Sequence, residues 1–253
     1  MKKIIRALFS LACSLTVSFS QSGFDIAEKL DKKERPHSVS SRISMILTNS
    51  KNKSRKNVMI SKSINRGKYQ LLWVLEPKSD RGISFLRKEY VDRDNEIRMW
   101  LPAFNKIRRI NSNRMSDSFM GSDLSYEDLN SRVLSDNEYE RLSDEKFNGV
   151  NCYVMNVIPK IKINGSYSMH KVWVSKKDLR IMKEYSFDKN NEIIKTKKFI
   201  YETIKGYDIV SEISVLDFKR QHSTKVIIEN IILNEGIEPK LFQEKNLKRI
   251  PKN

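Results

Sequence analysis

Apolar and polar side chains alternate along most of this chain after its first forty residues, and this period of two constrains the fold most. Clear runs lie at residues 69–75, 97–101, 150–158 and 170–174. Because successive side chains of a β-strand point to opposite faces, the pattern predicts strands of a sheet with one face buried. Helical spacing is confined to one short segment, where Phe24, Ala27 and Leu30 share a face.

Turn residues separate these runs. Asn148 and Gly149 form the strongest short-range hairpin signal, Asn164 and Gly165 mark a longer connection, and residues 188–191 mark another hairpin. The pattern predicts a mainly β (α+β) fold with about ten to eleven antiparallel strands. Because the chain has no repeat and no Pro- or Gly-rich linker, we expect one sheet. It should wrap around short helices as an incomplete barrel.

The N-terminus has the pattern of an export signal. Three basic residues within the first six precede the uncharged run 7–19, and Ser18 and Ser20 are small residues just before Gln21. The run is shorter than the roughly 20 residues that a membrane-spanning helix needs. We therefore expect a signal peptide over residues 1–20, a single domain over residues 21–253 without a transmembrane segment, and a periplasmic location.

The two cysteines bear on this expectation. Cys13 lies inside the apolar run and offers an alternative, in which it becomes an acylated N-terminal residue that anchors the protein to a membrane. Cleavage near Ser20 instead leaves Cys152 as the single thiol and excludes an internal disulfide. The apolar neighbours Val150, Tyr153 and Val154 predict that Cys152 is buried.

The formal net charge of +17 is spread along the whole chain. No RNP, zinc-finger or helix-turn-helix pattern accompanies it, which argues against nucleic acid as a partner. A basic exterior attracts anionic lipid headgroups, although it is also compatible with an ordinary solvated surface. His37, His170 and His222 are isolated in sequence, and there is no metal-binding or nucleotide-binding motif. We therefore expect neither a metal nor a cofactor.

Residues 99–128 join a strand to a polar loop. Pro102 cannot donate to a β-ladder and therefore suits a strand end or an edge. Gly121 permits a backbone geometry or a close approach that other residues resist. Phe119 and Met120 are a flexible apolar pair on a loop and are candidates for a lid that contacts lipid.

The polar residues of the same segment have a structural interpretation. Asp123 or Asp128 is expected to cap a short helix or to pair with Arg108 or Arg109, and Tyr126 to cover the apolar side of the loop. Direct contact of these residues with a ligand is the alternative.

This segment resembles the motif of the bacterial outer-membrane lipoprotein-sorting proteins, which are relatives of the LolA and LolB periplasmic carriers. The motif residues are Pro102, Arg108, Arg109, Phe119, Met120, Gly121, Ser122, Asp123, Tyr126 and Asp128. The hairpin from Gly149 through Cys152 to Pro159 and the closing residues 230–242 also resemble this family. The resemblance implies an incomplete barrel plugged by helices, an apolar cavity for acyl chains, residence in the periplasm, and no enzymatic activity.

Six apolar residues of the alternating runs are candidates for the cavity wall, although alternation alone does not say which face each one occupies. They are Leu71, Trp73, Phe85, Trp100, Val172 and Val174.

Three functions stay open. The first is a carrier or chaperone that binds acyl chains or lipoproteins and delivers them toward the outer membrane. The second is a periplasmic accessory module of an inner-membrane lipid exporter of the resistance-nodulation-division type. The third is a lipid hydrolase that would assemble Ser122, Asp123 and a distant histidine.

Overall fold

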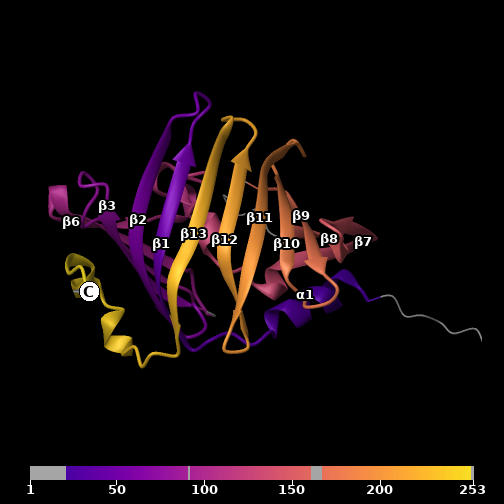
Figure 1. Cartoon of the computed structure of the whole chain (residues 1–253), viewed down its shortest axis with the longest axis horizontal. Coiled ribbons are helices and arrows are strands. Elements are labelled where there is room, and N and C mark those ends of the chain that lie inside the picture. The colour runs from indigo at the N-terminus through magenta and orange to yellow at the C-terminus, as the bar shows by residue number, and fades with distance from the viewer. Residues whose placement is uncertain (1–20, 91, 161–166, 252–253) are drawn as a thin grey trace, which may run out of the picture.

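The computed structural model describes residues 21–90, 92–160 and 167–251 (Figure 1). The expected signal peptide with Cys13 and the expected turn at Asn164 and Gly165 lie outside the described residues. In the described chain the helix is α1 (Gly23–Asp31) and the strands are β1 (Ser38–Thr48), β2 (Ser54–Ile64), β3 (Tyr69–Glu76), β4 (Ser84–Lys88), β5 (Glu96–Leu101), β6 (Lys106–Ile110), β7 (Asn137–Phe147), β8 (Val150–Pro159), β9 (Met169–Ser175), β10 (Ile181–Phe187), β11 (Ile193–Ile204), β12 (Tyr207–Asp217) and β13 (His222–Leu233). Short 3-10 helices are η1 (Pro102–Phe104), η2 (Ser112–Arg114), η3 (Phe119–Gly121), η4 (Glu127–Leu129), η5 (Leu134–Asp136), η6 (Pro239–Leu241) and η7 (Glu244–Lys248).

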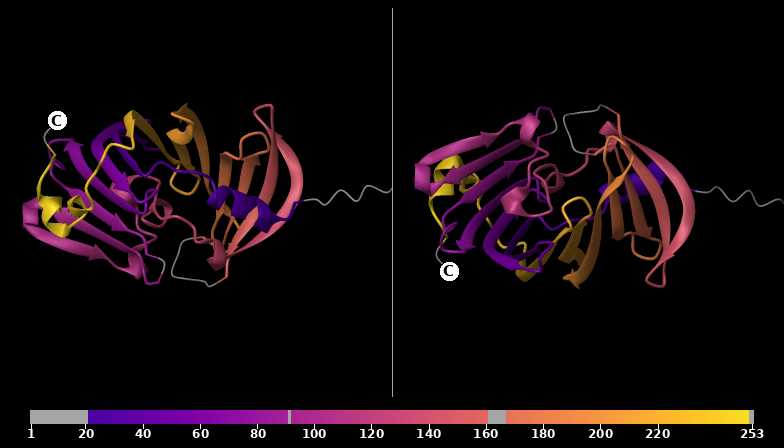
Figure 2. Two further views of the ribbon diagram at one scale, coloured as in Figure 1. Left: turned by 90° about the horizontal axis from the view of Figure 1, so that it is seen from below. Right: turned by 90° about the horizontal axis from the view of Figure 1, so that it is seen from above.

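All thirteen strands form one antiparallel sheet in the order β6-β5-β4-β3-β2-β1-β13-β12-β11-β10-β9-β8-β7. The described edge strands β6 and β7 do not pair with each other, so the sheet bends without closing, as Figure 2 shows. The incomplete antiparallel barrel is confirmed, but the expected count of ten to eleven strands was too low. The short edge strand β6, Lys-Ile-Arg-Arg-Ile, is mostly charged and lacks clean alternation, so its sequence resembles a loop.

Local sequence explains several elements. The side chains of Ser22 and Asp25 form a capping box at the start of α1, which confirms the helix expected around residues 24–30. Asn148 and Gly149 both have positive φ, +49° and +79°, as a type I′ turn between β7 and β8 requires. Cys152 is buried, as its apolar neighbours predicted.

Two further segments pack on the sheet. The helix α1 lies against β7 and β8, and its Ile26 and Ala27 share an apolar cluster with Met155 of β8 and with Val172 and Val174 of β9. On the outer side of the opposite half, the C-terminal segment with η6 and η7 covers β3 to β5 (yellow in Figure 2). Among the described helices, none combines the length and the apolar character needed to span a membrane.

Candidate functional site

The concave face of the half formed by β1 to β6, β12 and β13 is apolar. The strand register places side chains such as Leu72 opposite Phe85 and Met45 opposite Val226, so that they share this face. The buried strand residues of the cluster, which we call the concave cluster, are Met45, Leu47, Met59, Leu72, Val74, Phe85, Ile97, Ile110, Val215 and Val226.

Residues 111–136, here called the motif loop, connect β6 to β7 and cover the concave cluster. Phe119, Leu124 and Tyr126 of this loop are buried in the cluster. The Phe119 ring lies 4.9 Å from the ring of Phe85 and 5.9 Å from the ring of Tyr126, both in edge-to-face geometry. A segment outside the sheet therefore supplies the side chains that cover this apolar face.

One side of the motif loop is tied to β13 through Asp123, which is almost fully buried. The backbone N–H of Asp123 donates to the Thr224 hydroxyl at 2.9 Å, and that hydroxyl donates back to the Asp123 carboxylate at 2.6 Å. The Nδ1 atom of His222 lies 2.7 Å from the same carboxylate. Arg220 donates to the carbonyl of Ser122 at 3.2 Å.

The other side of the loop is tied to β10 and β11 by buried charges. Asp128 accepts from the ammonium of Lys197, from the Tyr167 hydroxyl at 2.9 Å and from the Ser125 backbone N–H at 2.8 Å. Lys197 also donates to Glu184 at 3.0 Å.

Arg132 of the loop extends this network, because it binds both carboxylate oxygens of Glu184 at 2.8 Å. His170 Nδ1 lies 3.1 Å from Glu184 and 3.0 Å from the Ser186 hydroxyl. We call Asp128, Arg132, His170, Glu184 and Lys197 the ionic latch.

The charge states follow from this geometry. Burial alone would raise the pKa of Asp128, but Lys197 and Lys195 outweigh it and lower this pKa to about 2. In the same way Arg132 and Lys197 overcome burial and hold the pKa of Glu184 well below its usual value. Burial and the nearby Arg132 lower the pKa of His170 to about 4. At neutral pH the latch therefore holds two carboxylates, two cations and a neutral imidazole.

Comparisons with known proteins agree with this architecture. A family model described as "-like: Uncharacterized protein" matches residues 66–249, well over half of the chain. An outer membrane lipoprotein-sorting protein domain from Vibrio parahaemolyticus has a TM-score of 0.84 and 28% identity, covering 90% of this chain and 98% of that one. The chain belongs to the family of this model, and its structure is similar to those of LolA-like outer-membrane lipoprotein-sorting proteins.

Two further solved structures share this fold. A DUF1329 family protein from Desulfovibrio piger has a TM-score of 0.84 and 26% identity, covering 89% of this chain and 97% of that one. A LolA superfamily protein from Nitrosomonas europaea shares the fold with a TM-score of 0.71 and 17% identity, covering 89% of this chain and 99% of that one. No curated protein matches the sequence.

The motif residues lie in three places. Phe119 to Asp128 lie in the motif loop, and Gly121 has φ +77°, which justifies a glycine there. Pro102 begins η1 at the end of β5. Arg108 and Arg109 are exposed on the edge strand β6.

The expected pairing of Asp123 or Asp128 with Arg108 or Arg109 is wrong. The partners of the two carboxylates are cations of β11 and polar groups at the start of β13. Asp128 lies within η4, whose N-cap, Tyr126, makes no side-chain capping hydrogen bond; its carboxylate accepts from the Ser125 backbone N–H just ahead of that helix.

The six candidate cavity residues occupy three different environments. Phe85 lies in the concave cluster, and Val172 and Val174 lie under α1. Leu71, Trp73 and Trp100 point to the outer face, where they are buried against Phe242 and Leu247 of the C-terminal segment. The candidate set must therefore be corrected: its outer three members are not on the concave face.

Sequence reasoning missed the partners that hold the motif loop. Lys197, Glu184 and Thr224 are single polar residues inside alternating strands and look like ordinary solvent-facing positions. Once the strand pairing is known, residues 195, 197 and 199 share a face with apolar side chains of the neighbouring strand, which indicates that Lys197 is buried. The sequence alone does not give this pairing.

The geometry gives no support to a serine nucleophile. The Ser122 side chain is fully buried, donates to the carbonyl of Phe119 at 2.6 Å and accepts from the N–H of Leu124 at 3.2 Å. His222 bonds to Asp123, but in the described chain no hydrogen bond joins Ser122 to a histidine. Within the described ranges, no group of three or more His, Cys, Asp or Glu side chains could hold a metal ion.

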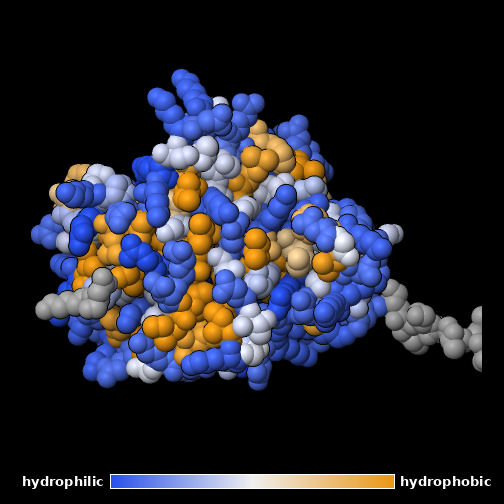
Figure 3. Space-filling view, in the orientation of Figure 1, coloured by the Kyte–Doolittle hydropathy of each residue, from blue (hydrophilic) through white to orange (hydrophobic). Residues whose placement is uncertain are grey.

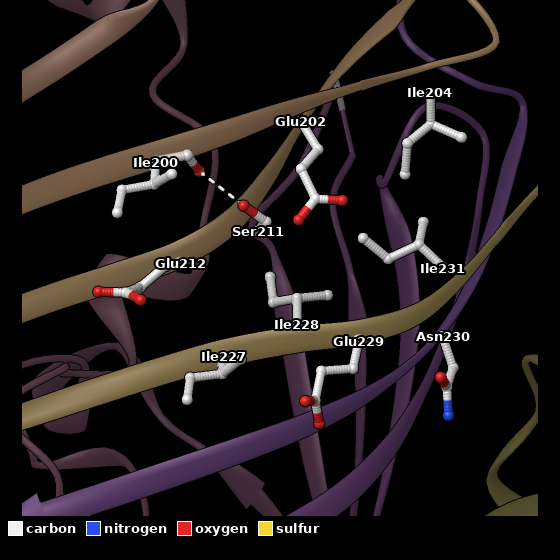
Figure 4. Close-up of a pocket in the computed structure, with 10 residues that line it drawn as sticks. All are labelled: Ile200, Glu202, Ile204, Ser211, Glu212, Ile227, Ile228, Glu229, Asn230 and Ile231. Atoms are coloured by element: carbon white, nitrogen blue, oxygen red, sulfur yellow. Dashed lines mark hydrogen bonds between the residues drawn. The ribbon is translucent and has the colours of Figure 1, made fainter.

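A groove opens in the wall of the sheet beside this LolA-like interior. Pairing between β12 and β13 ends at Glu212 opposite Ile227, and the remaining halves of the two strands diverge. The groove between them has a volume of about 590 Å³ and is shown in Figure 4, where Ile204, Ile228 and Ile231 surround it. Ile228 also packs against the concave cluster, so the groove borders the interior.

Proposed function

We propose that this protein is a periplasmic lipid or lipoprotein carrier that holds an acyl chain against the concave cluster and delivers it toward the outer membrane. One observation carries the proposal. The apolar concave face is covered by the motif loop rather than by strands of the sheet, so the cover can leave without breaking a β-ladder.

The composition of the concave cluster suits a flexible ligand. Five of the nine methionines of the chain lie in or against the concave cluster: Met45, Met59, Met99, Met115 and Met120. Methionine has three rotatable bonds and a polarizable thioether, so it adapts to irregular shapes. The methionine side chains can therefore pack against Phe119 when the loop covers the cluster and against an acyl chain when one is bound.

The energetics are compatible with exchange between the loop and an acyl chain. Each methylene moved from water to an apolar site contributes about 0.8 kcal/mol. About ten methylenes would supply about 8 kcal/mol, against the cost of withdrawing the three loop side chains that are buried in the cluster. An acyl chain of ordinary length can therefore replace the apolar contacts of these three side chains.

A reversible tether tests the proposal directly. Asp123→Cys with Thr224→Cys places two thiols where a backbone N–H now reaches a side-chain hydroxyl at 2.9 Å. With this disulfide formed, titration of a fluorescent fatty acid into delipidated protein should show at least tenfold weaker binding than the same variant after reduction. Equal binding by the oxidised and reduced forms would reject displacement of the loop.

A matched pair of truncations locates the acyl site. Phe85→Ala, on the concave face, should weaken fatty-acid binding, whereas Trp100→Ala, on the outer face, should leave it unchanged. Both changes remove a buried ring, so loss of stability alone would affect them alike. Ester hydrolysis is assayed in parallel. Turnover that disappears in Ser122→Ala would replace the carrier with a hydrolase.

The proposed periplasmic location depends on residues 1–20. Intact-mass measurement of the exported protein should show a chain that begins near Gln21. A diacylated species that begins at Cys13 would contradict a freely diffusing carrier.

A further inference from the structure

Five connections between strands lie at the same end of the sheet. Pairing between adjacent hairpins places each of these turns beside its neighbours. The pairs nearest the turns are Val58 with Glu76, Ser84 with Trp100, Thr48 with Ser223 and Lys195 with Asp217. We call this set the hairpin rim: residues 49–56, 77–83, 102–106, 188–192 and 218–221. The rim includes the upper ends of the β1–β2 and β12–β13 hairpins in Figure 1.

The hairpin rim carries uncompensated positive charge. Its acids already face bases: Asp80 lies 3.4 Å from Arg55, and Asp188 and Glu192 both face Lys219. Seven exposed cations of the rim have no acidic partner among the described residues. They are Lys51, Lys53, Lys56, Lys78, Arg81, Lys106 and Lys189.

Aromatic side chains project from the same rim. Phe104, at the tip of the β5–β6 hairpin, is 64% exposed, and Phe218, in the β12–β13 turn, is 46% exposed. Figure 3 shows hydrophilic side chains projecting over the tip of the β1–β2 hairpin, and hydrophobic ones beside them over the β12–β13 hairpin. Exposed aromatic rings among cations suit the headgroup region of a bilayer, where rings with an apolar body are enriched.

The motif loop reaches this rim. Arg55 of the rim donates to the carbonyl of Met120 at 3.2 Å, and Arg220 donates to the carbonyl of Ser122 at 3.2 Å. Whatever binds the rim therefore lies next to the cover of the concave cluster.

We propose that the hairpin rim docks on the surface of an anionic lipid bilayer, with its lysines on the headgroups and Phe104 and Phe218 at the level of the interface. The proposal goes beyond acyl binding, because the surface would attract a bilayer even if the concave face held no lipid. In the docked protein, lipid headgroups compete with the carbonyls of Met120 and Ser122 for Arg55 and Arg220. The motif loop is therefore released at the membrane surface.

Co-sedimentation with vesicles tests the charges. The purified protein should bind vesicles that contain phosphatidylglycerol, and binding should weaken as salt is raised. Lys51→Gln, Lys53→Gln and Lys56→Gln together should lower the partition coefficient about a hundredfold, since each surface cation contributes about fivefold. The matched control removes three exposed cations from the opposite end of the sheet: Arg66→Gln, Lys68→Gln and Lys205→Gln.

The aromatic part has its own control. Phe104→Ser should weaken vesicle binding severalfold at all salt concentrations, whereas Ile200→Ser, which removes a side chain that is 55% exposed on the outer wall, should not.

Equal losses in the rim and control variants would overturn the proposal, as would equal binding to phosphatidylcholine vesicles. Retention on immobilised polyglutamate without any vesicle binding would also overturn it and would indicate an acidic protein partner. Because fatty-acid titration is measured separately, failure here leaves the carrier proposal standing.

Discussion

Lys197 and Glu184 show how much single buried residues do in this fold. Their side chains are 6% and 4% exposed, and each contacts an opposite charge from the motif loop. Burying an ion without a partner is costly, whereas a fully paired group costs much less. The ionic latch therefore stabilises the covered position of the motif loop on the side of β10 and β11.

Removing Lys197 should destabilise the protein strongly. Lys197→Met leaves Asp128 and Glu184 buried with one counter-ion fewer, and we expect a loss of about 3–5 kcal/mol in the free energy of unfolding. Lys219→Met provides the control, because Lys219 is a largely exposed partner of Asp188 and should contribute little to stability. Urea denaturation of both variants measures the difference. Similar small losses would contradict the buried latch.

His170 should make stability depend on pH. Its pKa in the folded protein is about 4, below the usual 6.5, because of burial and Arg132. As pH falls from 6.5 toward 4, the unfolded chain takes up a proton that the folded protein excludes. The free energy of unfolding should then fall, by about 3 kcal/mol for this shift. Asp128, with its folded pKa of about 2, extends the loss between pH 4 and pH 2.

Urea unfolding at a series of pH values measures this dependence. His170→Gln should flatten the slope between pH 6.5 and 4 and leave the loss below pH 4 in place. An unchanged slope in this variant would assign the pH dependence to other groups.

At the scale of elements, α1 depends on one small residue. A Cβ at Gly23 would lie 2.7 Å from the carbonyl oxygen of Tyr139 in β7, a backbone atom that cannot rotate away. Gly23→Ala should push α1 off the sheet and cost about 1–3 kcal/mol by overpacking. Gly236→Ala is the control, since open space surrounds that position. Thermal unfolding of the two variants should differ by several degrees, and coincident midpoints would refute the close contact.

At the scale of the whole molecule, two separate apolar layers lie on opposite sides of strands β3 to β5. Phe242→Ala in the C-terminal segment removes a buried ring from the outer layer and should cost about 3–5 kcal/mol. It should also shift the tryptophan fluorescence to longer wavelength as Trp73 and Trp100 meet water. Fatty-acid binding by the folded variant should persist, because the concave cluster lies on the other face. Loss of binding at temperatures where the variant is folded would show that the layers are coupled.

Local patterns in the sequence determined the class of the fold. Alternation indicated the strands, Asn148 and Gly149 set one hairpin, and the spacing of Phe24, Ala27 and Leu30 indicated α1. These signals are readable because strand faces, tight turns and helix faces depend on neighbours within a few residues. The family motif around Phe119 and Gly121 was likewise visible in one continuous segment.

Only the tertiary structure decided which face each side chain occupies and which charges are buried. Trp73 and Phe85 come from similar alternating strands, yet one lies under the C-terminal segment and the other under the motif loop. Asp128 pairs with Lys197 rather than with Arg109, which is closer in the sequence. The reason is the strand order, which places β11 beside the motif loop and β6 at the edge of the sheet. Alternation divides the side chains of a strand between two faces but does not show which face is concave. The long-range pairing of strands and loops decides that.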